Sequence, residues 1–159
     1  MKNILIALDY DPTAEKIAQI GYEYAKPLNA RITLLHVISN EVYYSSRIYS
    51  PIMGFTGFTS AEPVDPENTE FLKEAAKKYL LNTKDHLGDL NINTIVREGD
   101  FAETIIQTAI EINADVIVLG THSRRWLEKI VMGSVTEQVL KLSTVPLLII
   151  PTRKEDEDD

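Results

Sequence analysis

Four short apolar runs along the chain constrain its fold more than any other feature. They are ILIAL at 4–8, ITLLHV at 32–37, VIVLG at 116–120 and LLII at 147–150. Each run is apolar at consecutive positions and rich in β-branched residues, which is typical of strands covered on both faces, as in parallel sheets. INTIV at 92–96 is more polar, so we expect a fifth strand at a sheet edge. The runs therefore predict a five-stranded parallel sheet.

Helical patterns separate these runs. Asp11-Pro12 and Asp65-Pro66 each have the form of a helix start, with a capping aspartate and a first-turn proline. Apolar residues at helical spacing follow them, namely Ala14, Ile17, Ala18, Gly21, Ala25 and Leu28 after the first, and Phe71, Leu72, Ala75, Ala76, Tyr79 and Leu80 after the second.

Two capping pairs predict the remaining helices. Asp100 with Glu103 precedes Ile105, Ile106, Ala109 and Ile110, and Ser134 with Glu137 precedes Val139 and Leu142. Strands that alternate with helices predict an α/β fold, a doubly wound five-stranded parallel sheet with helices on both faces. We expect one domain, because the chain has no internal repeat and no linker that would divide it.

Composition and charge exclude several kinds of partner and site. The chain has no cysteine, which excludes disulfides and thiolate metal sites, and its three histidines, His36, His86 and His122, lack metal-ligand spacing. We therefore predict no protein-held metal, and we expect His36 to be an ordinary buried residue. The net charge of −8 disfavours nucleic acid as a partner, since phosphate contacts require a broad basic surface.

The two ends of the chain and its hydropathy suggest where it works. No apolar run reaches the ~20 residues of a membrane span. The first residues, MKNILIALDYD, suit a first strand better than a signal peptide, so we expect a cytoplasmic protein. Residues 153–159, RKEDEDD, hold two basic and five acidic residues, and we expect them to form a solvated, disordered tail.

The connection at 39–66 is far longer than the usual few residues. It carries the aromatic residues Tyr43, Tyr44, Tyr49, Phe55 and Phe58. One interpretation is a surface excursion that packs these rings on its own domain. The other is a lid or a partner-binding surface. The sequence leaves both open.

A glycine-punctuated basic loop follows the 116–120 run. It holds Gly120, then Arg124, Arg125 and Lys129, and ends at Gly133-Ser134 where a helix is expected. Ligands of parallel sheets bind beyond the carboxyl ends of the strands, where the strand order reverses. There, glycines would admit a ligand close to the backbone, and the free N–H groups of the helix, with the hydroxyls of Ser134 and Thr136, would face an anion.

Each part of this loop also has a purely structural interpretation. In that interpretation Ser134 with Glu137 is a complete capping box without any ligand, Gly120 ends a strand, and the basic side chains form a solvated face. A cap alone, however, does not require two glycines and a basic loop. The combination favours an anion site, and Asp9 and Asp11 after the first strand and Val37 after the second would lie at the same edge.

These segments resemble the universal stress protein family, whose nucleotide-binding signature is G-x-x-G, nine residues, then G-[ST]. The corresponding residues are Gly120-Thr121-His122-Ser123, residues 124–132, and Gly133-Ser134. ILIALDYDPTA at the start and LLHVI at 34–38 are also similar to that family. The resemblance extends to Pro151. It implies a single domain at 1–152 with a Rossmann-like fold of the adenine nucleotide alpha hydrolase type.

The resemblance also implies a ligand, ATP or the related ADP or AMP. Asp9 would hold the ribose hydroxyls, while Ala7 and the backbone of Val37 would meet the adenine. The groups around the phosphates would be Gly120, Thr121, His122, Ser123, Gly133, Ser134, Val135 and Thr136, with Arg124 adding charge near the outer phosphates. His122 has the alternative of packing beside the strand ends. A Mg²⁺ ion would be bound through the phosphates.

One position departs from the signature, because Ser123 stands where the family has its second glycine. If that position requires φ > 0, serine costs about 1 kcal/mol or more. If it does not, the backbone N–H is kept and the hydroxyl adds a contact.

The function that follows is an ATP-binding regulatory protein of the stress response, with no catalytic residue assigned. The resemblance adds a homodimer formed through the last strand, at 146–150. Two alternatives remain open. One is slow ATP hydrolysis, for which Asp11 or His122 would have to position water. The other is a dimeric interaction module that binds no nucleotide. A phosphoacceptor receiver domain is disfavoured, because it leaves 123–134 unexplained.

Overall fold

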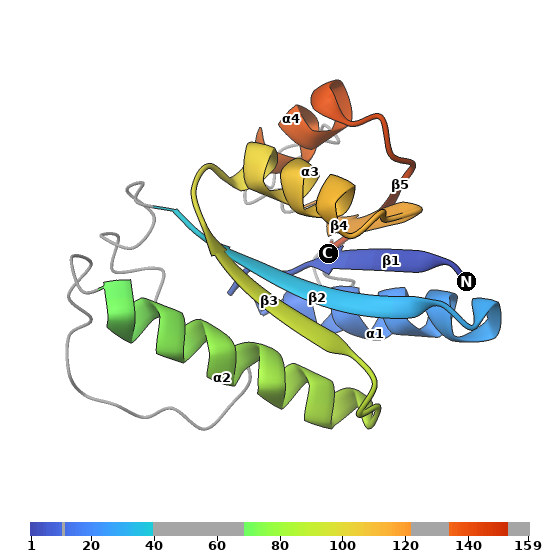
Figure 1. The fold of residues 1–159 in the computed structure, drawn as a ribbon, viewed down its shortest axis with the longest axis horizontal. Helices are drawn as coiled ribbons and strands as arrows, with labels where there is room; N and C mark the ends of the chain where they lie inside the picture. Colours follow the sequence, from blue (N-terminus) through green and yellow to red (C-terminus); the bar gives the residue numbers. More distant parts are fainter. Residues whose placement is uncertain (11, 40–68, 122–133, 153–159) are drawn as a thin grey trace, which may run out of the picture.

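The computed structural model describes residues 1–10, 12–39, 69–121 and 134–152 (Figure 1). In this part of the chain, strands and helices alternate in the predicted order. They are β1 (Asn3–Ala7), α1 (Ala14–Ala25), the 3₁₀ helix η1 (Lys26–Leu28), β2 (Arg31–Ile38), α2 (Thr69–Leu87), β3 (Asn93–Glu98), α3 (Phe101–Glu111), β4 (Val116–Gly120), α4 (Ser134–Leu142) and β5 (Leu147–Ile150).

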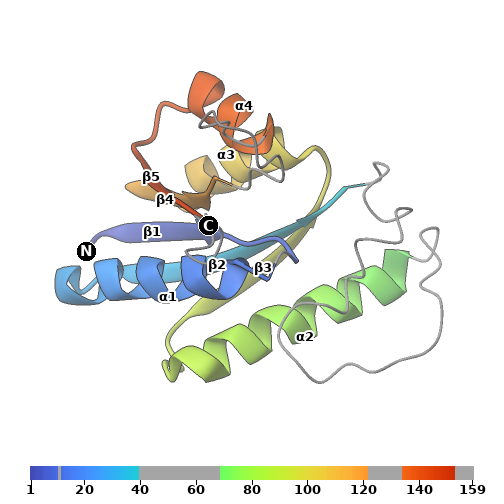
Figure 2. The same ribbon diagram turned by 180° about the vertical axis from the view of Figure 1, so that it is seen from behind.

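The strands form one parallel sheet in the order β3-β2-β1-β4-β5. Helices α1 and α2 cover one face, and α3 and α4 cover the other (Figures 1 and 2). The predicted doubly wound sheet is confirmed, as is the edge position of β3. The strand order reverses between β1 and β4, which are paired from Ile4 with Val116 to Ile6 with Val118.

Burial on both faces explains the continuous apolar runs. In β1, Ile4 and Ile6 pack into the cluster under α1 and α2, whereas Leu5 packs into the cluster under α3 and α4. In β4, Val118 joins the first cluster and Ile117 the second. Successive side chains of a strand point to opposite faces, so a strand between two helix layers has no solvated side for polar residues.

Helix α1 agrees with the prediction along most of its length, and differs at both ends. Its buried residues are those predicted, Ala14, Ile17, Ala18, Gly21 and Ala25. The helix begins at Ala14 and not at Pro12, because the first helical bond runs from the N–H of Ile17 to the carbonyl of Thr13. Leu28 is exposed, because the chain turns into η1 after Ala25 and so leaves the α-helical spacing.

The other helices bury narrower stripes than predicted. Leu72, Ala76, Tyr79 and Leu80 of α2 are buried as expected, but Phe71 is exposed. In α3 the buried stripe is Ala102, Ile105, Thr108 and Ala109, and Ile110, which lies outside it, is 60% exposed. In α4, Val139 is buried and the terminal Leu142 is exposed. The Asp100 cap is confirmed, since its carboxylate accepts a hydrogen bond from the Glu103 N–H at 3.1 Å.

Several expectations fall on residues outside the described part. These are the Asp11 cap, the helix start at Asp65-Pro66, the aromatic residues of the 39–66 connection, and the tail at 153–159. Helix α4 begins at Ser134 as expected, although Gly133 and the side chain of Ser134 also lie outside. No helix in the described ranges is both long enough and apolar enough to span a membrane.

Two glycines set how closely α1 packs on the sheet. A Cβ on Gly21 of α1 would lie 2.8 Å from Cδ1 of Ile6 in β1. A Cβ on Gly120, the last residue of β4, would overlap Cδ1 of Ile17 in α1 and lie 3.0 Å from Cγ2 of Thr152. Gly120 is therefore required for packing inside the protein, whatever binds nearby.

We predict that Gly120→Ala lowers the free energy of unfolding by about 1–3 kcal/mol, because the new methyl overpacks the α1 interface. Ile17→Val removes the overlapping Cδ1 and alone costs about 1 kcal/mol. The double variant should be more stable than the sum of the two losses predicts. Urea unfolding of the four proteins measures this coupling, and strictly additive losses would contradict the packing role of Gly120.

Candidate functional site

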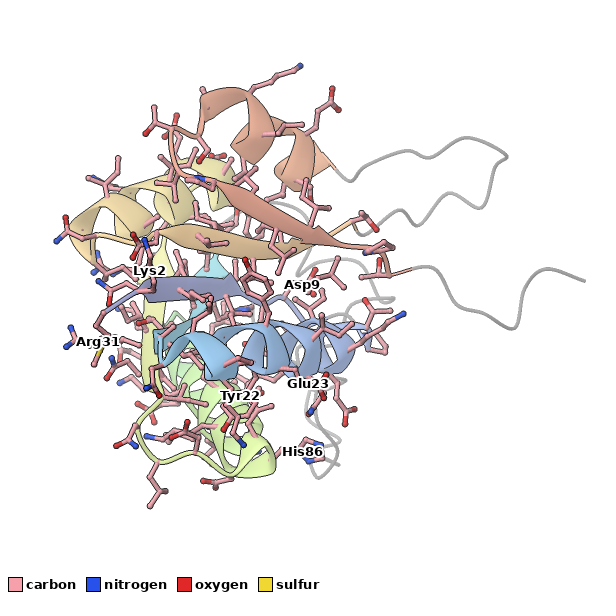
Figure 3. The ribbon with its side chains drawn as sticks, turned by 90° about the vertical axis from the view of Figure 1, so that its right-hand side faces the viewer. Lys2, Asp9, Tyr22, Glu23, Arg31 and His86 are labelled. Atoms are coloured by element: carbon pink, nitrogen blue, oxygen red, sulfur yellow. The ribbon has the colours of Figure 1, made fainter. Side chains whose placement is uncertain are left out.

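The predicted site residues that the structure describes meet at the carboxyl edge of the sheet. Ala7 ends β1 and Asp9 follows it, Val37 lies near the end of β2, and Gly120 and Thr121 lie at the end of β4. Figure 3 places Asp9 toward this edge, whereas Lys2 and Arg31 lie at the opposite, amino edge. Since β1 and β4 are neighbours and their helices cover opposite faces, this edge is the switch point where such sheets bind ligands.

Residues 8–10, which we call the β1 extension, carry Asp9 out from the sheet. The N–H of Leu8 donates to the carbonyl of Leu35 at 2.8 Å, which prolongs the β1–β2 ladder by one bond. Side chains hold the next two carbonyls. Nδ1 of His36 donates to the Leu8 carbonyl at 2.8 Å, and the Tyr79 hydroxyl donates to the Asp9 carbonyl at 2.6 Å. The half-buried Asp9 thus stands on a fixed backbone.

Three rings pack behind the β1 extension. The Tyr10 ring lies 4.2 Å from that of His36 and 5.1 Å from that of Tyr79, and the last two are 5.9 Å apart, all as distances between ring centroids. All three residues are buried. The sequence predicts that His36 and Tyr79 are in the core but not that they meet Tyr10, because residues 10, 36 and 79 lie far apart in the chain and no local pattern links them.

His36 is neutral in this environment. It is only 2% exposed, and burial lowers its pKa from the ordinary 6.5, opposed by the Leu8 carbonyl and the charge of Asp9. Because a carbonyl can only accept, Nδ1 carries the proton and Nε2 is the acceptor. No residue in the described ranges hydrogen bonds to Nε2. The expectation of a buried histidine is confirmed.

The backbone of Val37 faces the space beyond β1. The last register pair between the two strands is Ala7 with Leu35, whereas β2 continues to Ile38. Alternate residues of a parallel strand direct their N–H and C=O groups to the same neighbour, so Val37, like Leu35, points its backbone toward the β1 side. Its side chain is buried in the cluster under α3 and α4. Only the backbone of Val37 is therefore placed to meet a ligand.

Hydrogen bonds tie the start of α4 to the end of β4. The Thr136 hydroxyl donates to the Gly120 carbonyl at 2.8 Å and is buried. This corrects the expectation that this hydroxyl faces an anion, because its proton is already used within the protein. The bond instead fixes the first turn of α4 directly beyond β4, which brings the amides of Val135 and Thr136 near that edge.

A second set of bonds joins the ends of β4 and β5. The N–H of Thr121 donates to the Ile150 carbonyl at 3.1 Å, and the N–H of Thr152 donates to the Thr121 hydroxyl at 3.2 Å. The hydroxyls of Thr121 and Thr152 are also 3.2 Å apart. Thr121 is thus held in place at the point where the basic loop leaves the sheet.

Four predicted site residues, His122, Ser123, Arg124 and Gly133, lie outside the described residues, as do the Ser134 side chain and Asp11. Within the described part, no three histidine, aspartate or glutamate residues gather where they would hold a metal ion.

A shallow hollow of about 500 Å³ lies at the opposite, amino edge of the sheet. Its lining includes Tyr22, Lys26, Arg31 and Asp89, and the Tyr22 hydroxyl donates to Asp89 at 3.4 Å. None of the predicted site residues lines this hollow. Residues around this hollow can therefore serve as a negative control when ligand binding at the carboxyl edge is measured.

Comparison with known proteins gives one family. The model of the universal stress protein family matches residues 1–151. Universal stress protein MJ0577 of Methanocaldococcus jannaschii is 35% identical over 153 residues, with 94% of each chain covered.

Solved structures agree with this match. The MJ0577 structure superposes with a TM-score of 0.70 at 30% identity and covers 96% of both chains. A universal stress protein in complex with cAMP has a TM-score of 0.64 at 15% identity, covering 96% of this chain and 98% of its own. The Archaeoglobus fulgidus protein in complex with dAMP has a TM-score of 0.59 at 16% identity, covering 94% and 98%. At these identities, the last two support the fold alone.

We predict that the buried His36 makes stability depend on pH. The unfolded chain binds a proton below the ordinary pKa of 6.5, while the folded protein with its lowered pKa does not, so the free energy of unfolding falls as the pH drops below about 6.5. His36→Asn keeps an N–H donor near the Leu8 carbonyl but cannot titrate. Urea unfolding between pH 7.5 and 5 should show a shallower decline for the variant, and equal slopes would contradict a neutral, buried His36.

Proposed function

The chain belongs to the universal stress protein family, and from that premise and the geometry of the carboxyl edge we propose that it binds an adenine nucleotide there, with ATP as its ligand. The observation that carries the proposal is the convergence at the β1–β4 switch point. An aspartate on a fixed backbone, the end of β2 that continues past its last pair with β1, and a helix N-terminus all lie at the edge where parallel sheets bind ligands.

The nucleoside half of the ligand fits the β1 and β2 ends. Asp9 extends from the end of β1, and its carboxylate would accept hydrogen bonds from the ribose hydroxyls. Ala7 is small and half-buried, and the Val37 backbone faces the space past β1, where its N–H and C=O would meet the adenine edge. Peptide groups held rigidly by a sheet suit such recognition, because no side chain has to be ordered.

The phosphates fit the β4 and α4 ends. The first amides of α4 have no partner within the helix and carry its positive dipole, and the Thr136–Gly120 bond brings them to the end of β4. We propose that Gly120, Thr121, Ser134, Val135 and Thr136 offer backbone amides or hydroxyls to the phosphates, excepting the Thr136 hydroxyl and the Thr121 N–H, which donate to carbonyls within the protein. His122, Ser123, Arg124 and Gly133 of the signature would complete the set.

Related proteins support an adenine nucleotide and leave its phosphate number open. Universal stress proteins have been solved in complex with cAMP and with dAMP, each bearing a single phosphate. The choice of ATP rests on the length and charge of the signature loop, where Arg124 would neutralise the outer phosphates. Mg²⁺ would be held through those phosphates.

We further propose a cytoplasmic regulatory role and a homodimer. β5 lies at an edge of the sheet, with Leu147, Leu148 and Ile149 only half-buried. A second copy paired along residues 146–150 would cover that edge and its apolar side chains.

We predict that the purified protein binds ATP with Mg²⁺ more tightly than AMP in isothermal titration calorimetry. Gly133→Val should weaken ATP binding at least about tenfold, because its side chain intrudes where the phosphates would lie. The affinity for AMP, which lacks the outer phosphates, should fall by a smaller factor. Urea unfolding checks that the variant is folded.

Three results would count against this proposal. No heat with ATP, ADP or AMP at millimolar concentration would favour the interaction module that binds no nucleotide. Equal affinity for ATP and AMP would show that the signature loop does not bind the outer phosphates. Steady release of phosphate would point to hydrolysis, which we do not assign.

A further inference from the structure

We propose that Tyr79 of α2, supported by His36 of β2, is a positioning residue that aims the Asp9 carboxylate at the ribose of the bound nucleotide. This inference rests on the proposed function, since it concerns how that site is held ready. Neither residue belongs to the family signature or reaches the ligand in this account. Their role comes from the contacts they make with the β1 extension.

Asp9 lies where the sheet no longer holds the chain. The β1–β2 register ends at Ala7, and the Leu8 N–H makes the last ladder bond. Beyond that point a chain segment is usually free to vary in its backbone torsions, each of which would swing the Asp9 side chain. A carboxylate that must reach two adjacent ribose hydroxyls tolerates little such variation.

Beyond the sheet, side-chain hydrogen bonds to two consecutive carbonyls, those of Leu8 and Asp9, take the place of the backbone hydrogen bonds between strands. The Leu8 carbonyl accepts from His36, the Asp9 carbonyl accepts from Tyr79 at 2.6 Å, and the Tyr10 ring packs against both rings. Peptide planes on both sides of the Asp9 Cα are therefore fixed, and the direction of its Cα–Cβ bond is fixed with them.

The hydroxyl of Tyr79, which donates to the Asp9 carbonyl, has little conformational freedom. Tyr79 is buried, and its ring lies edge-on to the rings of Tyr10 and His36. A rigid ring carries its hydroxyl to one point, so the bond to the Asp9 carbonyl holds that peptide at a set distance from α2. Preorganisation of this kind raises affinity by reducing the ordering that binding requires.

The chain offers a matched pair of variants for a test. Tyr79→Phe deletes the hydroxyl that holds Asp9, whereas Tyr22→Phe deletes a hydroxyl that bonds Asp89 at the amino edge. Both proteins are titrated with Mg²⁺-ATP and with Mg²⁺-2′,3′-dideoxy-ATP, which lacks the hydroxyls that Asp9 would bind. Circular dichroism confirms that each protein is folded at the titration temperature.

The expected result is selective for the ligand. Tyr79→Phe should weaken ATP binding about five- to tenfold, the scale of one hydrogen bond, and leave dideoxy-ATP binding unchanged. Tyr22→Phe should change neither. In an Asp9→Asn background, Tyr79→Phe should have almost no further effect on ATP, because the two residues act through one contact. His36→Asn, which removes the ring beside Tyr79, should reproduce the selectivity with a smaller loss.

Other outcomes overturn the inference in distinguishable ways. If the unaltered protein binds ATP but Tyr79→Phe binds it equally well, or loses both ligands equally, the positioning role is wrong and the proposed function stands. If the unaltered protein binds neither ligand, both fall together. If Tyr79→Phe and Asp9→Asn reduce the ATP affinity additively, Tyr79 does not act through Asp9, and the inference is likewise overturned. Should Tyr79→Phe be unfolded, the His36→Asn titrations decide by the same criterion.

Discussion

The burial of β1 and β4 on both faces is the constraint on which the rest of the structure depends. Strands between two helix layers carry apolar side chains along their whole length, as Leu5 and Ile6 do on opposite faces. Polar groups that act on a ligand can then lie only where the strands end. The parallel arrangement brings all the carboxyl ends to one edge, and the order β3-β2-β1-β4-β5 opens that edge between β1 and β4.

The site depends on the same layers through bonds made just beyond the strands. Helix α4 is held to β4 by Thr136, and the β1 extension is held to β2 and α2 by His36 and Tyr79. Gly120 allows α1 to lie against β4 through Ile17. One helix from each face thus fixes a different side of the edge. A shift of α2 would move Asp9, and a shift of α4 would move its own first amides, without any change in the sheet.

The parts of this architecture that depend on local pattern could be predicted from the sequence. Continuous apolar runs located β1, β2, β4 and β5, the more polar run at 92–96 located β3, and the Asp100 cap located the start of α3. Periodicity failed where burial depends on the packing partner, because Phe71 and Ile110 have the right spacing but lie at the margins of their helix contacts. The role of the Thr136 hydroxyl was also beyond reach, since the sequence gives no sign that its oxygen meets the Gly120 carbonyl. The contact between Tyr10 and Tyr79 could not be predicted either, because these residues are far apart in the sequence.

The most direct measurement of the central claim is an amide NMR titration of the full chain with Mg²⁺-ATP. We predict that chemical-shift changes concentrate at Asp9, Val37, Thr121, Val135 and Thr136, while the amides of Asn29, Arg31 and Asn91 around the amino-edge hollow stay unchanged. Changes confined to that hollow, or no changes at millimolar ATP, would contradict a nucleotide site at the carboxyl edge.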